Sequence, residues 1–260
     1  MLVLLGPSFD GSSRSFEALA AAAQLVVYDL RSRCKPGYWG VVRAIADASQ
    51  ARALAHQLRE AGFPVVAIDR ASATETDHRF VRLAHVAFAQ DELVLGVGDR
   101  EMPVSYAAIL TIVRGEVGSA ARPSVGMRSS ASSGGFPAVT RGLDVSPARS
   151  SDEYPAADLH FHTVRWTGRV DARHCDLSAV PGSTGHAPRD LELFLEELAK
   201  RSGVQVDRGA RMSSLASYAS ERQRRVTPVP GDGLEAAPDP FDNYSCLVAD
   251  AAFALAHGAE

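Results

Sequence analysis

Cysteine is scarce in this sequence of 260 residues. The three cysteines are odd in number and lie far apart, at Cys34, Cys175 and Cys246. This spacing fits neither the disulfide framework of a small secreted domain nor a CxxC metal site. We therefore expect free thiols, a reducing compartment and a cytoplasmic protein.

Long hydrophobic runs are also missing. The apolar start, residues 1–5, ends at Gly6 and Pro7 and has no basic leader, so it is not typical of a signal peptide. No other run approaches the ~18 consecutive apolar residues that a membrane helix needs. The sequence predicts a soluble protein without a membrane partner.

An excess of positive charge is absent as well. The formal net charge is -4 and the isoelectric point is about 6.1, whereas non-specific binding to nucleic acid requires a basic surface. Lys35 and Lys200 are the only lysines, and we attribute the abundance of arginine to genomic base composition. We expect no nucleic-acid partner.

The composition and length of the chain indicate a globular protein with two domains. Hydrophobic residues make up 46% of the chain and charged residues 22%, close to globular averages, and the length favours more than one domain. Residues 118–156 are rich in serine, glycine and proline and contain the tract SSASSGG, which predicts a flexible linker. We expect an α/β domain in residues 1–117 and an α+β domain in residues 157–260.

The first half contains a clearly marked strand-helix-strand unit. Residues 41–46 and 65–68 have the pattern of strands, and residues 47–61 between them have that of an amphipathic helix. Asp47 is suited to cap this helix and Gly62 to end it. The pattern predicts a βαβ unit with two parallel strands. The glycine-rich turn that binds phosphate in such units is absent.

Antiparallel strands are expected after this unit. Residues 80–88 and 92–97 predict a hairpin, and further strands are expected at 102–104 and 109–114, with a helical turn at 105–108 between them. The pattern leaves open whether residues 1–117 form one mixed sheet or two subdomains.

The second half combines a hairpin with helices. Residues 158–166 and 169–177 alternate in polarity, and Thr167-Gly168 between them predicts the turn. Apolar stripes and capping signals predict three helices, at 188–201, at 210–222 and from Asp239-Pro240 onward. The overall fold class is therefore α/β and α+β: a βαβ unit with additional antiparallel strands, a linker, and a β-hairpin plus helices.

One motif suggests chemistry: Asp158-Leu159-His160-Phe161-His162-Thr163. Alternation along a strand places Asp158, His160 and His162 on one face, and two imidazoles in this arrangement bind divalent metals well. The string resembles the first metal-binding motif of the polymerase and histidinol phosphatase superfamily of metal-dependent phosphoesterases. The resemblance implies that His160 and His162 bind metal and that the metal activates water for attack on a phosphate ester.

The resemblance covers only these six residues. It implies a barrel of repeated strand-helix units, which needs about 200 residues or more, and the expected downstream motifs are not found. A smaller metal site is the second possibility, with His174 on the return strand facing His160 or His162 and with Cys175 or Asp176 nearby. The alternative is structural: histidines on the polar face of a half-exposed hairpin.

Two functional hypotheses follow. The first is a non-enzymatic regulatory or interaction module with a protein or small-molecule partner that the sequence does not identify. The second is a divalent-metal-dependent, phosphoesterase-like hydrolase that uses the motif of residues 158–163. The candidate metal residues are Asp158, His160, His162 and His174. No other residues are assigned to catalysis or cofactor binding, and the oligomeric state is left open.

Overall fold

The computed structural model describes residues 1–69, 79–118, 153–163, 166–225 and 240–258. Its helices are α1 (Ser13–Ala23), α2 (Val27–Arg33), α3 (Ala48–Glu60), α5 (Ala187–Ser202), α6 (Ser214–Arg225) and α7 (Pro240–His257), with short 3-10 turns η1 (Tyr106–Ala108) and η2 (Gly209–Arg211). Its strands are β1 (Leu2–Leu5), β2 (Gly40–Ala44), β3 (Val65–Ile68), β4 (Arg79–Arg82), β5 (His85–Phe88), β6 (Glu92–Val97), β7 (Arg100–Ser105), β8 (Ile109–Val117), β9 (Tyr154–Phe161), β10 (Trp166–Asp171) and β11 (Val206–Asp207).

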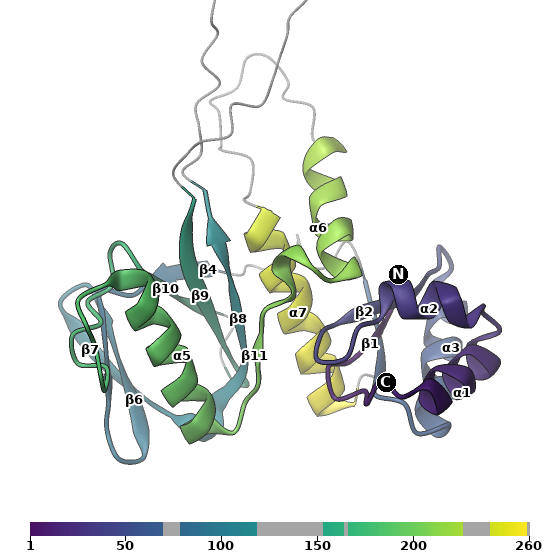
Figure 1. Cartoon of the computed structure of the whole chain (residues 1–260), viewed down its shortest axis with the longest axis horizontal. Helices are drawn as coiled ribbons and strands as arrows, with labels where there is room; N and C mark the ends of the chain where they lie inside the picture. Colours follow the sequence, from purple (N-terminus) through teal and green to yellow (C-terminus); the bar gives the residue numbers. More distant parts are fainter. Residues whose placement is uncertain (70–78, 119–152, 164–165, 226–239, 259–260) are drawn as a thin grey trace, which may run out of the picture.

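The elements form successive layers around a central sheet (Figure 1). The strands of that sheet follow the order β11-β8-β9-β10-β4. Helix α5 and the sheet β5-β6-β7 lie on one side of it, and α7 lies on the other. Beyond α7 come the sheet β2-β1-β3 and then the helices α1 to α3. The mixed α/β and α+β fold class expected from the sequence is confirmed.

The N-terminal sheet corrects the predicted βαβ unit. The strand, helix and second strand are present, and Asp47 caps α3 by accepting a hydrogen bond from the Gln50 amide at 2.8 Å. However, β1 lies between β2 and β3 and is antiparallel to both, so the expected direct parallel pairing is wrong. All four residues of β1 are buried apolar side chains, as expected for a central strand covered on both faces.

The central sheet takes strands from both sequence halves. Strand β8 pairs with β9 from Ile109 opposite Phe161 to Val117 opposite Tyr154, and β4 pairs with β10 in parallel. The boundaries expected at residues 117 and 157 therefore do not separate two sheets. Most of the predicted linker, residues 119–152, lies outside the described part of the chain.

The hairpin of β9 and β10 turns earlier than expected. Strand β9 ends at Phe161 and β10 begins at Trp166, so the predicted turn at Thr167-Gly168 lies inside β10. Gly168 is opposite Leu159 in the ladder. A Cβ at Gly168 would lie 3.2 Å from the Trp166 ring and 3.3 Å from Leu83, so this glycine allows close packing within the sheet.

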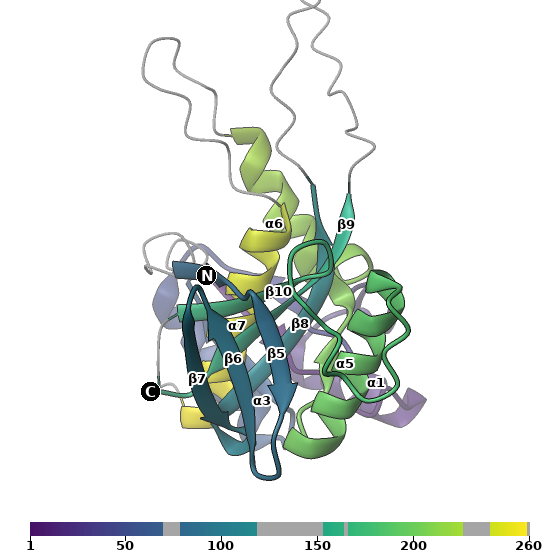
Figure 2. The same cartoon turned by 90° about the vertical axis from the view of Figure 1, so that its left-hand side faces the viewer.

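The strand predicted at 80–88 is divided between two sheets. Strand β4 ends at Arg82 and joins the central sheet, whereas β5 begins at His85 and pairs with β6. The hairpin turn between β5 and β6 and the strand β7 are confirmed. Figure 2 shows the sheet β5-β6-β7 in front of the strands of the central sheet.

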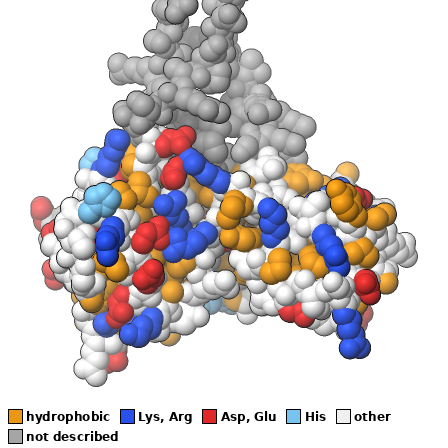
Figure 3. All heavy atoms as spheres, in the orientation of Figure 1, with side chains coloured by type: hydrophobic (Ala, Val, Ile, Leu, Met, Phe, Trp, Pro, Cys, Tyr) orange, Lys and Arg blue, Asp and Glu red, His pale blue; other side chains and the backbone are white. Residues whose placement is uncertain are grey.

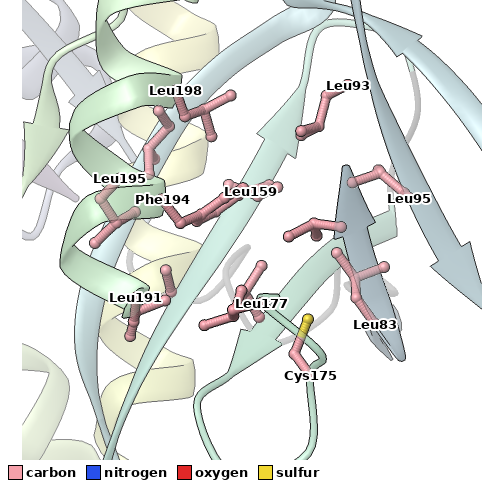
Figure 4. Close-up of a cluster of buried hydrophobic side chains, with 14 of the residues drawn as sticks. Leu83, Leu93, Leu95, Leu159, Cys175, Leu177, Leu191, Phe194, Leu195 and Leu198 are labelled. Atoms are coloured by element: carbon pink, nitrogen blue, oxygen red, sulfur yellow. The ribbon is translucent and has the colours of Figure 1, made fainter. Parts of the chain in front are cut away.

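One hydrophobic core fills the space between α5, the sheet β5-β6-β7 and the central sheet. Leu191, Phe194, Leu195 and Leu198 of α5 are fully buried there, as their helical spacing predicts. Their side chains face Leu159 of β9 and, across the core, Leu93 and Leu95 of β6 (Figure 4). Residues from both sequence halves therefore share this core.

A second core surrounds α7. Phe241, Tyr244 and Val248 of this helix are buried together with Val41 and Val66 of the N-terminal sheet. Val113 and Ala156 of the central sheet belong to the same cluster. Helix α7 thus joins the two sheets. In the described part of the chain, no helix has the length and apolarity needed to span a membrane.

Candidate functional site

The motif residues Asp158 and His160 lie on the face of β9 that packs against α7. Both are almost completely buried, with exposures of 0% and 3%. Ala157, Leu159 and Phe161 alternate with them and belong to the core on the other face. The alternation read from the sequence thus places Asp158 and His160 correctly on one face.

His160 is held between a strand and a helix. Its Nε2 lies 2.8 Å from Ser245 Oγ of α7, and its Nδ1 lies 3.1 Å from Thr167 Oγ1 of β10. A serine and a histidine at this distance have the spacing of a nucleophile and its base. Ser245 is 0% exposed, however, so a substrate has no access to this pair, and its contacts stabilise the packing of α7.

Asp158, which is fully buried, belongs to a group of three charges whose third member, Asp242, is 24% exposed. Arg169 of β10 donates from Nε and Nη2 to the two oxygens of Asp158 at 2.7 and 2.8 Å, and its Nη2 also lies 2.7 Å from Asp242 of α7. The guanidinium stacks over the ring of Phe80 at 4.4 Å and near that of Phe241 at 5.2 Å. Burial lowers the pKa of Arg169, but the two carboxylates outweigh this effect and raise it overall.

His162 lies outside this buried layer. It follows the end of β9, where its backbone amide donates to the Ala108 carbonyl at 3.0 Å. Its ring centre is 5.5 Å from that of His257 near the end of α7, and His257 stacks on Phe253 at 4.1 Å. His160 and His162 therefore have different surroundings and different partners.

His174 forms a separate pair with Asp171. Its Nδ1 lies 2.7 Å from Asp171 Oδ2, and the Arg173 amide donates to Asp171 Oδ1 at 2.9 Å. The side chain of Asp171 is 1% exposed, whereas that of His174 is 51% exposed. A buried carboxylate thus fixes the orientation of a half-exposed imidazole.

The described residues contain no group of three or more histidine, cysteine, aspartate or glutamate side chains able to hold a metal. Asp158 and His160 lie in the layer beneath α7 with different partners, His162 lies beyond the end of β9, and His174 pairs with Asp171. Sequence reasoning missed Arg169, Asp171 and Ser245. The Asp-x-x-His spacing of residues 171–174 and the polar residues inside the apolar helix α7 were the available signals.

The cysteines do not offer a nucleophile. All three are buried, and burial raises the pKa of the Cys34 and Cys175 thiols to about 12. The pKa of Cys246 is raised for the same reason. Because the thiolate is the reactive form, these side chains are inert in the folded chain.

A buried acid joins η2 to α7. Asp207 Oδ1 accepts hydrogen bonds from the Tyr244 hydroxyl at 2.6 Å and from the Gly209 amide at 2.7 Å. Within the described residues its Oδ2 is buried without a hydrogen bond. Burial raises the pKa of Asp207 above its ordinary value, although the two hydrogen bonds oppose this effect. Ionisation of this group therefore opposes folding.

This acid predicts a pH dependence of stability. A carboxyl group whose pKa is raised in the folded state adds stability at pH values below its ordinary pKa near 4. This added stability is lost as the pH rises through the raised pKa. A tenfold difference in proton affinity between the folded and unfolded states corresponds to about 1.4 kcal/mol. The wild type should therefore lose free energy of unfolding relative to Asp207→Asn between pH 4 and 7. Urea titrations of both proteins test this, and a pH-independent difference would contradict it.

Charged side chains form a network on the surface over β8, β11 and α5. Glu192 pairs with Arg114 at 3.0 Å and with Arg208 at 2.6 Å. Glu116 pairs with Arg114 at 3.6 Å and also contacts Arg211. Figure 3 shows these acidic and basic colours alternating across this part of the face.

A shallow pocket lies beside this network. Its lining consists of Arg114, Gly115, Glu116, Arg208, Ala210, Arg211 and Met212. The side chain of Met212 is 53% exposed. We call Arg114, Arg208, Arg211 and Met212 the arginine surface. Comparison of the chain with protein-family models, with curated proteins and with solved structures gave no match.

Proposed function

We propose that this chain is a non-enzymatic interaction protein that binds a protein partner through the arginine surface. The composition of this surface supports the proposal, because arginine and methionine are enriched in protein interfaces. Three arginines surround a pocket whose lining includes the small residues Gly115 and Ala210. Three guanidinium groups and the exposed thioether of Met212 therefore surround one pocket.

The ion pairs prepare the arginines for binding. Each guanidinium carries five N–H donors, and Arg208 uses Nη1 in its pair with Glu192 while Arg211 uses Nη2 in its pair with Glu116. Ordering a long side chain on binding costs about 0.5–1.5 kcal/mol. Arginines already held by glutamates reduce this cost, so the surface is suited to acceptor groups and apolar side chains of a partner.

The buried motif agrees better with this function than with metal-dependent hydrolysis. His160 is directed to Ser245 and Asp158 to Arg169, so both side chains are engaged inside the protein. Elemental analysis separates the two functions. A stoichiometric divalent metal in the wild type that is lost in the His160→Ala/His162→Ala double variant would favour the hydrolase.

The interaction function is tested with charge and size changes at exposed positions. The Arg208→Glu/Met212→Glu double variant should reduce capture of specific partners about tenfold or more, because central interface side chains often contribute over ~1 kcal/mol each. The measurement is quantitative mass spectrometry of proteins retained from a lysate by the immobilised full chain.

Arg52→Glu serves as the matched control, since Arg52 is exposed on α3, beyond the N-terminal sheet. Circular dichroism confirms the fold of each variant. The proposal fails if the wild type retains no protein above the empty matrix, or if the double variant and the control retain the same amounts.

A further inference from the structure

Two histidines from distant segments of the chain meet where β9 and α7 end. His162 follows Phe161, the last residue of β9, and His257 is the last residue of α7. Their ring centres lie 5.5 Å apart, with 65° between the ring planes. Neither histidine belongs to the arginine surface, so this pair is a separate feature of the fold.

The ring of His257 is oriented by its own helix. Its Nδ1 lies 3.0 Å from the backbone carbonyl oxygen of Phe253. Because a carbonyl only accepts, Nδ1 of the neutral ring carries the hydrogen and Nε2 keeps a free electron pair. The ring also stacks on that of Phe253, with 4.1 Å between centres and 23° between planes. Histidines that bind metal typically donate their other ring N–H to a carbonyl or carboxylate in this way.

His162 is held by its backbone and has an available ring. Its amide donates to the Ala108 carbonyl at 3.0 Å. Among the residues that the structure describes, its ring contacts His257 but takes part in no hydrogen bond or ion pair. The side chain is half-buried, and that of His257 is exposed. Both rings are therefore open to solvent on at least one side.

The distance between the rings suits one shared ion. Two imidazoles on a tetrahedral ion, with nitrogen–metal bonds of about 2.0–2.1 Å, have ring centres about 5 Å apart. The observed 5.5 Å is close to this value. A modest rotation of the His162 side chain therefore directs a ring nitrogen to an ion bound by His257 Nε2.

The end of α7 favours a cation of this kind. The carboxyl end of a helix carries partial negative charge, and His257 closes a helix of 18 residues. Imidazole nitrogen is a preferred ligand of zinc, copper and nickel ions, whereas magnesium and calcium prefer oxygen. Charge and ligand type thus select the same class of ion.

We propose that His162 and His257 bind a borderline divalent cation such as Zn²⁺, with water or a donor group of another molecule at the remaining positions. Two protein ligands are fewer than the four of a structural zinc site, so the ion is exchangeable. It joins the end of β9 to the end of α7. The site includes His257, which lies outside the motif of residues 158–163.

The experiment titrates the untagged, metal-free full chain with Zn²⁺ and, separately, with Mg²⁺. Calorimetry gives the affinity and stoichiometry, and imidazole NMR signals identify the histidines that respond. The wild type should bind about one Zn²⁺ per chain at this pair and bind it more tightly than Mg²⁺. Loss of a mere outer-shell partner costs about 10–100-fold in metal affinity, so His162→Gln and His257→Gln should each weaken binding about tenfold or more.

His56→Gln is the matched control, because His56 is an exposed histidine on α3 that pairs with Glu60 at 3.5 Å. It should leave Zn²⁺ binding unchanged, and thermal unfolding without metal confirms the fold of each variant. The proposal is overturned if Zn²⁺ binds no better than Mg²⁺, or if His56→Gln weakens binding as much as His257→Gln. Binding that needs His162 but not His257 also overturns it, and would assign the ion to the motif of residues 158–163.

Discussion

Replacing Arg169 with methionine is expected to lower the free energy of unfolding by about 3–5 kcal/mol, the usual cost of removing one partner from a buried ion pair. The substitution leaves Asp158, with a fully buried side chain, and Asp242 without their common cation. It also removes the guanidinium stacked over Phe80. Urea unfolding followed by circular dichroism measures the loss.

Two further variants keep this prediction testable even if Arg169→Met fails to fold. Asp242→Asn leaves the two hydrogen bonds between Arg169 and Asp158 in place, so we expect a loss of only about 1–2 kcal/mol. Arg52→Met, on the exposed face of α3, should change stability by less than about 0.5 kcal/mol. A loss at Arg169 as small as that at Arg52 would show that Arg169 does not stabilise the fold through these carboxylates.

Truncation of Phe194 to alanine is expected to have a comparable effect, about 3–5 kcal/mol. This side chain is 0% exposed in the core beneath α5, and its ring lies 5.5 Å from that of Phe88 at the end of β5. The loss combines the transfer of the aromatic ring to water with the cavity that remains. Denaturant unfolding measures it.

Phe253→Ala provides the control, because Phe253 is 47% exposed on α7 and its truncation should cost less than about 1 kcal/mol. Since the core around Phe194 includes residues from both halves of the sequence, the signals of tryptophan fluorescence and circular dichroism should shift to lower urea together. Separate transitions, or equal losses at Phe194 and Phe253, would contradict the shared core.

Several elements were predictable because their signals are local. The stripe of α5 from Leu191 to Leu198 repeats at helical spacing, and each predicted position is buried. Asp47 caps α3 through its own side chain and the amide three residues later. Such features depend on neighbouring residues alone, so periodicity and capping rules find them.

Other expectations were wrong because long-range packing decides them. The helix predicted at 210–222 begins only at Ser214 in α6, and Met212, which precedes it, is exposed. Thr167 and Gly168 have the composition of a turn, yet Thr167 is buried in β10 and contacts His160. The close approach of Leu83 and Trp166 to Gly168 is invisible in the local sequence.

The candidate sites show the same division. Alternation along β9 was sufficient to place Asp158 and His160 on one face. Their partners come from other elements: Arg169 of β10 donates to Asp158, and Ser245 of α7, which is 85 residues from His160 in the sequence, contacts His160. The spacing alone therefore suggested a metal site, whereas in the structure the same residues contact a serine and an arginine.

The sequence by itself determined the best-marked elements, such as α3 and α5 with their apolar faces, and the mixed fold class, since these follow from local periodicity and capping. Only the tertiary structure decided that β1 separates β2 from β3, that strands of both halves share one sheet, and that α7 lies between two sheets. The physical reason is that strand pairing and core packing join residues far apart in the chain, and many alternative pairings satisfy the same local pattern.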